Sequence, residues 1–297
     1  MARILNRRKF IGTTSFTAAG VMMGSSFAAG CSPDVHRAVE PYDIMADVMK
    51  YRKIDAHCHP EDDLAKQIET ADRLGIEWLQ ISQPVTNFSG TEPEGPDVVR
   101  QHNDEVYKAM KAYPGRFVGF FTLNPIYRKE SLEEIKRCVD LGMSGYKGYI
   151  QVKVNDPLYY PIIEKLIDLK MVVFMHTFCQ MGMGGYRMKY DTGRFPGTTL
   201  PEDMVEAAKR YPEAMFHFAH IGGGGDWEYE CKMLKQCPNI FVDTGGSNNE
   251  EHMIDFAIEQ LGEDRIFFGT DNCYHHGIGK ILASNATEAQ KKKIFFD

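Results

Sequence analysis

Two histidines flank one cysteine in IDAHCHP, residues 54–60. Alternate residues of an extended strand share a face, so His57 and His59 can point toward one site while Cys58 points away from it. Neutral imidazole nitrogens are common ligands of zinc and similar divalent ions. The chain has 10 histidines among 297 residues. A chance His-x-His pair is therefore common, and the motif alone is weak evidence for a metal site.

Three further potential ligands follow apolar, β-branched stretches later in the chain. His176 lies near the end of MVVFMHTF, His220 near the end of AMFHFAHIG, and Asp271 at the end of RIFFGTD. Imidazoles combined with one carboxylate suit zinc or a similar divalent ion. Five potential ligands, each at the end of a predicted strand, predict a metal site.

Short apolar runs alternate with amphipathic stretches through the body of the chain. Helix candidates include 131–142, with Ser131 as N-cap and a terminal glycine, and also 201–212 and 250–262. Eight such units in one domain-sized chain predict a closed (β/α)8 TIM barrel, whose active site lies at the C-terminal ends of the strands. An open doubly wound sheet would need a glycine fingerprint where HCHPEDD stands. The predicted strands are 53–59, 76–82, 117–124, 145–152, 171–178, 214–222, 239–246 and 265–271.

From about Lys53 to Ile294 the sequence resembles the amidohydrolase superfamily. The branch it resembles contains aminocarboxymuconate semialdehyde decarboxylase and related lactone hydrolases. The resemblance rests on IDAHCHP, FVGFFTLNP, MVVFMHT, FAHIGG and LGEDRIFFGTD, in this order. It implies one zinc ion bound by the residues that match the branch's ligands. It also implies an unligated histidine, here His220, that faces the reacting group. The implied ligands are His57, His59, His176 and Asp271.

Lys147 lies on the predicted fourth strand, where binuclear members of the superfamily carry a carboxylated lysine that bridges two metals. GYKGY does not place Lys147 convincingly at the bridging position. We therefore expect a single metal, with Lys147 near the barrel wall or facing substrate. The chain ends in KKKIFFD, roughly where relatives continue into a last helix. We expect that helix to be short or absent, unless the sequence is incomplete.

The first 30 residues have the composition of an export signal. NRRKFIG (6–12) is followed by an uncharged stretch to Gly30, and the paired Arg7 and Arg8 resemble a twin-arginine signal. A transmembrane anchor is the alternative, but the many glycines and hydroxyl residues of the uncharged stretch make it a poor membrane-spanning helix. FAAGC resembles a lipoprotein box with Cys31 as the lipidated residue; ordinary signal-peptidase cleavage is the alternative. Residues 31–51 are then a tether and 52–297 the barrel, exported to the periplasm or held at the membrane by lipid.

The charge balance limits the class of partner. The chain has 34 Lys and Arg against 41 Asp and Glu. The four charges in residues 1–30 are all basic, so the remainder has 30 against 41, or −11. An acidic body without basic runs argues against nucleic acid and against an anionic membrane surface, leaving a lipid anchor as the only expected membrane link. The partner is then a small molecule, with oligomerisation left open. Because twin-arginine cargo folds in the reducing cytoplasm, we expect the cysteines of the body to be unpaired.

Several other residues are candidates for substrate contacts. Arg187 and Arg194 lie in the long connection after the fifth strand and either pair with a substrate carboxylate or are solvated. His275 follows the eighth strand and either contacts substrate or has no role in the site. His217, three residues out of phase with His220, is expected to face the helices.

Three functions fit these residues. The first is a metal-dependent hydrolase of a small lactone, amide or ester, in which Asp271 accepts a proton from metal-activated water and His220 polarises the carbonyl. The alternative is a non-oxidative decarboxylase of an unsaturated or aromatic carboxylic acid, with His220 protonating the carbon. The third is a metal-holding surface lipoprotein without turnover. Export favours hydrolysis of incoming nutrients, and the sequence does not name a substrate.

Overall fold

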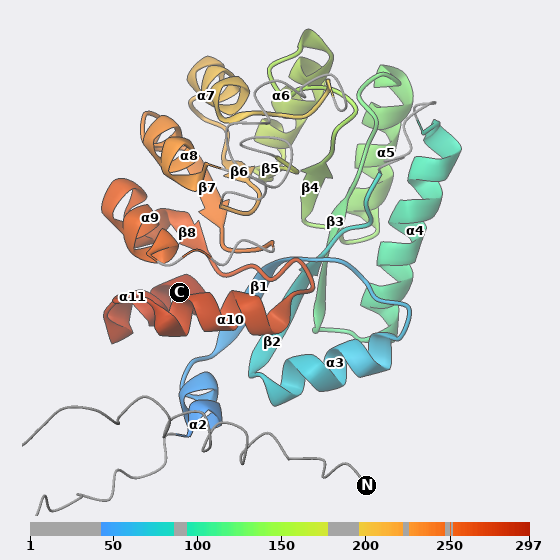
Figure 1. Ribbon diagram of the computed structural model, residues 1–297. Helices are drawn as coiled ribbons and strands as arrows, with labels where there is room; N and C mark the ends of the chain where they lie inside the picture. The colour runs from blue at the N-terminus through green and yellow to red at the C-terminus, as the bar shows by residue number, and fades with distance from the viewer. Residues whose placement is uncertain (1–42, 86–93, 178–195, 222–225, 247–249, 251) are drawn as a thin grey trace, which may run out of the picture. The chain divides into compact units, whose positions relative to one another are not determined.

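Eight parallel strands pair in sequence order, β1 to β8, in this computed structural model. Figure 1 shows helices arranged outside the strands. All eight predicted strands are confirmed, and each is shorter than its predicted range. The structure describes residues 43–85, 94–177, 196–221, 226–246, 250 and 252–297. The strands are β1 (Lys53–Cys58), β2 (Ile76–Ile81), β3 (Phe117–Phe121), β4 (Gly145–Gly148), β5 (Val173–Met175), β6 (Phe216–Phe218), β7 (Ile240–Asp243) and β8 (Ile266–Phe267).

The helices alternate with the strands and bury their apolar faces against them. Buried residues of α4, α6 and α7 belong to one hydrophobic core that also contains outward-facing strand residues. The alternation confirms the (β/α)8 TIM barrel. The helices are α2 (Ile44–Met49), α3 (Leu64–Arg73), α4 (Pro96–Ala112), α5 (Arg128–Asp140), α6 (Tyr160–Asp168), α7 (Pro201–Arg210), α8 (Trp227–Leu234), α9 (Met253–Leu261), α10 (Tyr274–Ala283) and α11 (Glu288–Phe295).

The end of β8 is tied to β1, which brings the first and last strands together. The Ala56 amide donates to the Phe268 carbonyl at 2.8 Å. Beyond the strand, the Thr270 amide and hydroxyl donate to the two carboxylate oxygens of Asp55, at 3.0 and 2.5 Å. The Asp271 amide donates to the His57 carbonyl at 2.7 Å. These bonds place the residues after β8 directly beside those that end β1.

Alternate strand residues fill the interior of the barrel. Lys147, Phe174 and His217 are neighbours in register on β4, β5 and β6. On β1 the alternation is interrupted. Ile54 and Ala56 line an interior cavity, so strict alternation would turn the next residue, His57, outward. A register shift between Asp55 and Cys58 instead turns His57 inward, which is how a bulge re-aims a side chain.

The folded unit begins at Asp43, so the prediction of a tether through residue 51 is wrong. The Asp43 side chain caps α2 by accepting from two amides of its first turn, and Val48 of this helix is buried. The buried Lys53 ammonium donates to the carbonyls of Val48 and Tyr51 and holds the helix end against β1. A helix of 6 residues so close to the first strand has little periodic signal of its own.

The predicted export signal, Cys31 and the rest of the tether lie outside the described residues. Within the described part of the chain, no helix combines the length and apolar character needed to cross a bilayer.

The helix limits differ modestly from those predicted. α5 begins at Arg128, before Ser131, whose hydroxyl donates to the Asn124 carbonyl at 2.9 Å, so Ser131 is not the N-cap. Gly142, with φ of 88°, follows the helix end as predicted. α11 has 8 residues and includes most of the KKKIFFD segment.

Candidate metal centre

His57, His59 and Asp271 form a compact group of potential metal ligands. One donor atom from each lies within 4.8 Å of the other two. The Asp271 carboxylate oxygen is 3.1 Å from His59 Nε2 and 3.7 Å from His57 Nε2. Bonds of about 2.1 Å to a tetrahedral zinc ion place neighbouring ligand atoms about 3.4 Å apart. The two separations bracket this value, so the group fits a divalent cation.

Hydrogen bonds to the other ring nitrogens orient both histidines. His57 Nδ1 lies 3.2 and 3.1 Å from the two oxygens of Asp243. His59 Nδ1 donates to the Ser82 carbonyl at 2.7 Å. Burial lowers the pKa of His57 to about 4, so its ring is neutral. A neutral ring that donates through Nδ1 carries a lone pair on Nε2, and both histidines direct that atom toward Asp271.

Asp271 is held in a left-handed conformation with φ of 51°, and Asn272 follows with φ of 61°. The Asn272 side chain accepts from the His59 amide at 2.7 Å and donates to the His59 carbonyl at 3.0 Å. Burial would raise the pKa of Asp271, but attraction to His57 and the hydrogen bond with His59 outweigh it, and the pKa lies far below its usual range. Asp271 is therefore an anion and a candidate ligand, and Asn272 is a supporting residue that the sequence reasoning did not identify.

His176 and His220 lie next to this group. The His220 ring stacks on His57 with centroids 5.6 Å apart and meets the His176 ring edge-on at 5.0 Å. Among the described residues, the group within 4.8 Å does not include His176, which was expected as a ligand. His220 has φ of 38°, a strained value for a residue with a side chain. The barrel thus gathers all five of the predicted strand-end residues, but only three share the ligand geometry.

Lys147 points into the centre. Its Nζ lies 3.1 Å from His57 Nε2 and 3.2 Å above the centroid of the Phe174 ring. The side chain is fully buried, and burial lowers its pKa to about 7. The sequence expectation allowed a position near the wall or toward substrate, and the structure places Lys147 at the metal ligands themselves.

The expectation that His217 faces the helices is wrong. Its ring stacks on Phe174 inside the barrel, with centroids 3.8 Å apart, and its Nε2 donates to Asp243 at 2.8 Å. The expectation extended strand alternation from His217 to His220. β6 ends at Phe218, and the left-handed turn at His220 breaks that alternation, so both histidines lie inside.

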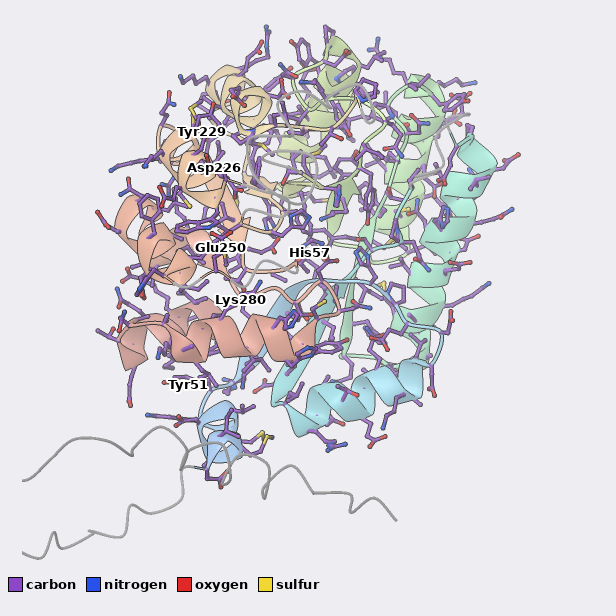
Figure 2. The ribbon with its side chains drawn as sticks, in the orientation of Figure 1. Tyr51, His57, Asp226, Tyr229, Glu250 and Lys280 are labelled. Atoms are coloured by element: carbon purple, nitrogen blue, oxygen red, sulfur yellow. The ribbon has the colours of Figure 1, made fainter. Side chains whose placement is uncertain are left out.

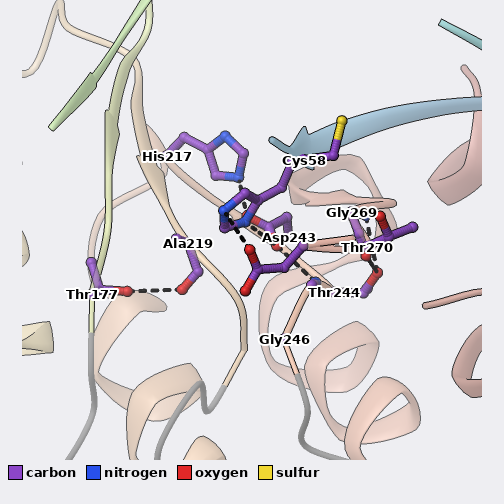
Figure 3. Close-up of polar contacts among 12 residues, drawn as sticks. Cys58, Thr177, His217, Ala219, Asp243, Thr244, Gly246, Gly269 and Thr270 are labelled. Carbon is purple, nitrogen blue, oxygen red and sulfur yellow. Dashed lines mark hydrogen bonds and ion pairs between the residues drawn. The ribbon is translucent and has the colours of Figure 1, made fainter. Parts of the chain in front are cut away.

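Asp243, at the end of β7, is the most connected residue that sequence reasoning missed (Figure 3). It is fully buried and also accepts from the Gly245 amide at 2.7 Å. Burial would raise its pKa, but attraction to His57 and hydrogen bonds from His217 and His57 hold it well below its usual range. A Cβ at Gly245 or Gly269 would come within 2.7 or 2.9 Å of this carboxylate, so both positions need glycine. The only sequence signal was the DTGG stretch (243–246) at the end of the predicted seventh strand.

Of the remaining predicted substrate residues, the structure describes only His275. Arg187 and Arg194 lie outside the described residues. His275 is the second residue of α10, beside His276, and lines a cavity of about 500 Å³ that residues of α9 also line. Lys280 of α10 separates it from the β7 end by donating to the carbonyls of Thr244 and Gly246. In Figure 2, His57 lies within the ring of strands and Lys280 on the outer helix.

The cysteines that the structure describes are all free, as expected. They are Cys58, Cys138, Cys231, Cys237 and Cys273.

Comparison with known proteins agrees with this architecture. The model of the family described as Amidohydrolase matches residues 33–295. The 2-amino-3-carboxymuconate-6-semialdehyde decarboxylase of Dictyostelium discoideum is 23% identical over 277 residues, which covers 84% of this chain and 76% of the relative.

Two solved structures share the fold. The 2,6-dihydroxybenzoate decarboxylase from Rhizobium superposes with a TM-score of 0.66 at 18% identity, covering 82% of this chain and 96% of that one. A dihydroxybenzoic acid decarboxylase from Polaromonas sp. JS666, with bound manganese and the inhibitor 2-nitroresorcinol, superposes with a TM-score of 0.63 at 17% identity. It covers 82% of this chain and 94% of that one.

Proposed function

Because this chain belongs to the amidohydrolase family, we propose that it is a metal-dependent enzyme that decarboxylates an unsaturated or aromatic carboxylic acid without oxidation. The comparisons favour this reaction over the hydrolysis of a lactone, amide or ester, which the sequence reasoning preferred. The relatives in Dictyostelium, Rhizobium and Polaromonas are all named as decarboxylases. The expected export had favoured hydrolysis, because exported enzymes often hydrolyse nutrients. That argument concerns the location of the protein and does not bear on the groups that react.

The observation that supports this proposal best is the pairing of Lys147 with the metal ligands. Three ligand atoms and one buried amine meet at His57, so two sources of positive charge converge there. A carboxylate substrate is the complementary group, since charge-assisted hydrogen bonds to carboxylates are strong. A lactone or amide would leave the second charge without a partner.

We assign one divalent ion to His57, His59 and Asp271, with His176 as a further ligand, and we keep zinc as the proposed metal. When bound, the ion supplies positive charge that holds the substrate and stabilises charge developing in the reaction. Manganese in the Polaromonas relative is consistent with a divalent ion of either kind.

His220 is the proposed proton donor at carbon. The bond between the substrate carbon and its carboxylate breaks, CO₂ leaves, and the electron pair left on that carbon takes the proton from His220. Solvent then restores the proton to the imidazole. Lys147 holds the carboxylate until it leaves, and Asp243 keeps His57 oriented. The stacking of His220 on His57 places the donor beside the group that holds the substrate.

The test is a panel of aromatic and unsaturated acids, including 2,6-dihydroxybenzoate, alongside lactones, amides and esters. Metal content is measured in parallel. We expect CO₂ release with one solvent deuterium incorporated at the former carboxyl-bearing carbon. Turnover of a lactone, amide or ester with incorporation of solvent ¹⁸O, and no acid decarboxylated, would contradict the proposal and restore hydrolysis.

Lys147→Met tests the role of the buried amine. Loss of a charge-assisted contact worth about 1.5–3 kcal/mol is expected to raise KM for the acid roughly 10- to 100-fold. Lys53→Met is the matched control, because Lys53 is also fully buried but binds carbonyls beside α2. An unchanged KM in Lys147→Met would remove the carboxylate contact from the mechanism.

We also propose that the protein is exported by the twin-arginine route and lipidated at Cys31, on the basis of NRRKFIG and FAAGC. Replacing Arg7 and Arg8 by lysine is expected to leave precursor in the cytoplasm. Cys31→Ala is expected to release a soluble form. Normal export of the double variant would contradict the route, and unchanged membrane association of Cys31→Ala would contradict the anchor.

A further inference from the structure

A continuous line of hydrogen bonds runs from the metal ligands into the barrel interior. His57 on β1 meets Asp243 at the end of β7, and Asp243 meets His217 on β6. The three side chains are 1%, 0% and 2% exposed. Figure 3 shows the His217 and Asp243 side chains meeting in the close-up of these contacts.

The charge on Asp243 fixes which nitrogen of each histidine carries the proton. A buried carboxylate without donors is costly, so both histidines must present an N–H to it. His57 therefore carries its proton on Nδ1 and His217 on Nε2. The first assignment leaves Nε2 of His57 as the atom with the lone pair, which Lys147 Nζ faces at 3.1 Å and which a bound metal would take.

The His217 ring is held in place by its stacking on Phe174 and by its hydrogen bond to Asp243. Its ring stacks on Phe174 at an interplanar angle of 8°, and it lines a cavity of about 320 Å³ at the other end of the barrel interior. The carboxylate is confined as well, because the Gly245 amide donates to the same Oδ1 that lies near His57. Asp243 thus has one position in which all its donors are satisfied, and that position sets the plane of the His57 ring.

We propose that Asp243 and His217 are positioning residues that set the tautomer and ring orientation of His57 for metal binding, with His217 acting through Asp243. This inference rests on the proposed metal centre and extends it to a residue on β6 that touches neither the ion nor the substrate. Partners that hydrogen-bond a ligand histidine typically change metal affinity 10- to 100-fold.

The experiment compares Asp243→Asn, His217→Leu and His217→Gln with the wild-type protein. Affinity for Zn²⁺ is measured by chelator competition, and the Co²⁺-substituted proteins are compared by visible absorption. Asp243→Asn is expected to weaken metal binding 10- to 100-fold and to change the cobalt spectrum, because an amide no longer selects the Nδ1–H form of His57. His217→Leu is expected to weaken binding in the same direction and less.

His217→Gln supplies the decisive comparison. Glutamine retains an N–H donor for Asp243, so its metal affinity is expected to lie within about threefold of wild type, a smaller loss than the 10- to 100-fold typical of a lost supporting residue. Glu134→Gln is the matched control, since Glu134 is a buried carboxylate on α5 that binds Arg137 and Asn103. Its affinity and cobalt spectrum are expected to match wild type.

Two outcomes would overturn the inference. One is wild-type affinity and an unchanged cobalt spectrum in both Asp243→Asn and His217→Leu. The other is an equal loss of metal affinity in His217→Gln and His217→Leu, which would show that His217 contributes only by packing. A wild-type protein that binds no metal would instead overturn the proposed metal centre.

A measurement on the unmodified protein covers the case in which Asp243→Asn does not fold. Histidine ¹⁵N NMR of the metal-free protein is expected to show Nδ1–H at His57 and Nε2–H at His217. The opposite tautomer at His57 would contradict the inference without any substitution.

Discussion

The two ends of the barrel interior differ sharply although the same strands build both. At the carboxyl end stand His57, His59 and Asp271, with Lys147 beside them. At the amino end the strands contribute apolar side chains around a cavity of about 320 Å³, among them Ile54, Ala56, Val172, Met215 and Phe267. Phe174 contacts Lys147 and His57 on one side and His217 on the other. Phe174 thus lies in the same layer as Lys147 and His217, its neighbours in register on β4 and β6.

The backbone differs between the two ends as well. His220, Asp271 and Asn272 have positive φ and follow strands at the carboxyl end, whereas the positive values before strands at the amino end fall on glycines and on Lys170. Such conformations cost on the order of 1–3 kcal/mol each and persist only where surrounding bonds hold them. We therefore expect substitutions at the carboxyl end to change metal binding and chemistry. Substitutions at the amino end, apart from those at His217, should change stability alone.

The largest expected effect is the loss of a ligand. His57→Ala and Asp271→Ala should lower metal affinity by at least the roughly 100-fold seen when a supporting residue is lost, because the coordination sphere itself becomes incomplete. Elemental analysis and chelator competition measure the loss. Cys58→Ala, within the same motif but pointing away, should keep its metal. Undiminished metal in both ligand variants would place the site elsewhere, and two ions per wild-type chain would make Lys147 a bridging residue.

Next is the removal of the proton donor. His220→Ala should retain metal and lose about 10²- to 10⁴-fold in turnover, the range typical of general acid–base groups. Steady-state kinetics on an identified substrate, with metal content measured on the same sample, checks this. The exposed His252 provides a control, and His252→Ala should keep wild-type metal content and turnover. Near-normal turnover of His220→Ala would show that another group protonates the carbon.

At the amino end, Lys53 predicts a pH effect on stability that leaves the metal centre untouched. Burial lowers the pKa of Lys53 to about 8, while in the unfolded chain it is near 10.5. Between these values the unfolded state binds more protons, so the wild type should gain stability relative to Lys53→Met as pH rises from 8 to 10.5. The gain should be on the order of 1 kcal/mol after solvent screening. Urea unfolding of both proteins at several pH values tests it, and a constant difference would contradict it.

The smallest effect is expected from filling the amino-end cavity. Val172→Ile adds one methylene toward that space and should stabilise the fold by about 0.8 kcal/mol. Thermal unfolding should show a rise of about 2–4 °C, with metal affinity unchanged. A drop in metal affinity would mean that the two ends are coupled through Phe174, and the separation drawn above would fail.

Much of the architecture could be predicted from the sequence, because it depends on local patterns. Apolar runs of strand length alternating with amphipathic helices predicted eight strands, and all eight are present. The same reasoning placed His57, His59 and Asp271 at strand ends, where parallel strands of a barrel meet. The choice between hydrolysis and decarboxylation did not follow, since one ligand set serves both reactions.

What only the tertiary structure decided concerns distances between residues far apart in the chain. His57 and Asp243 are separated by 186 positions and lie within hydrogen-bonding reach only because the barrel closes. The turn at His220 lets that residue face inward together with His217, and a register shift in β1 turns His57 inward. Sequence periodicity cannot predict the turn or the register shift, because a single irregular residue reverses the face that the following side chains occupy. The sequence thus determined the strands and the donor types, while closure of the barrel decided which donors share one centre.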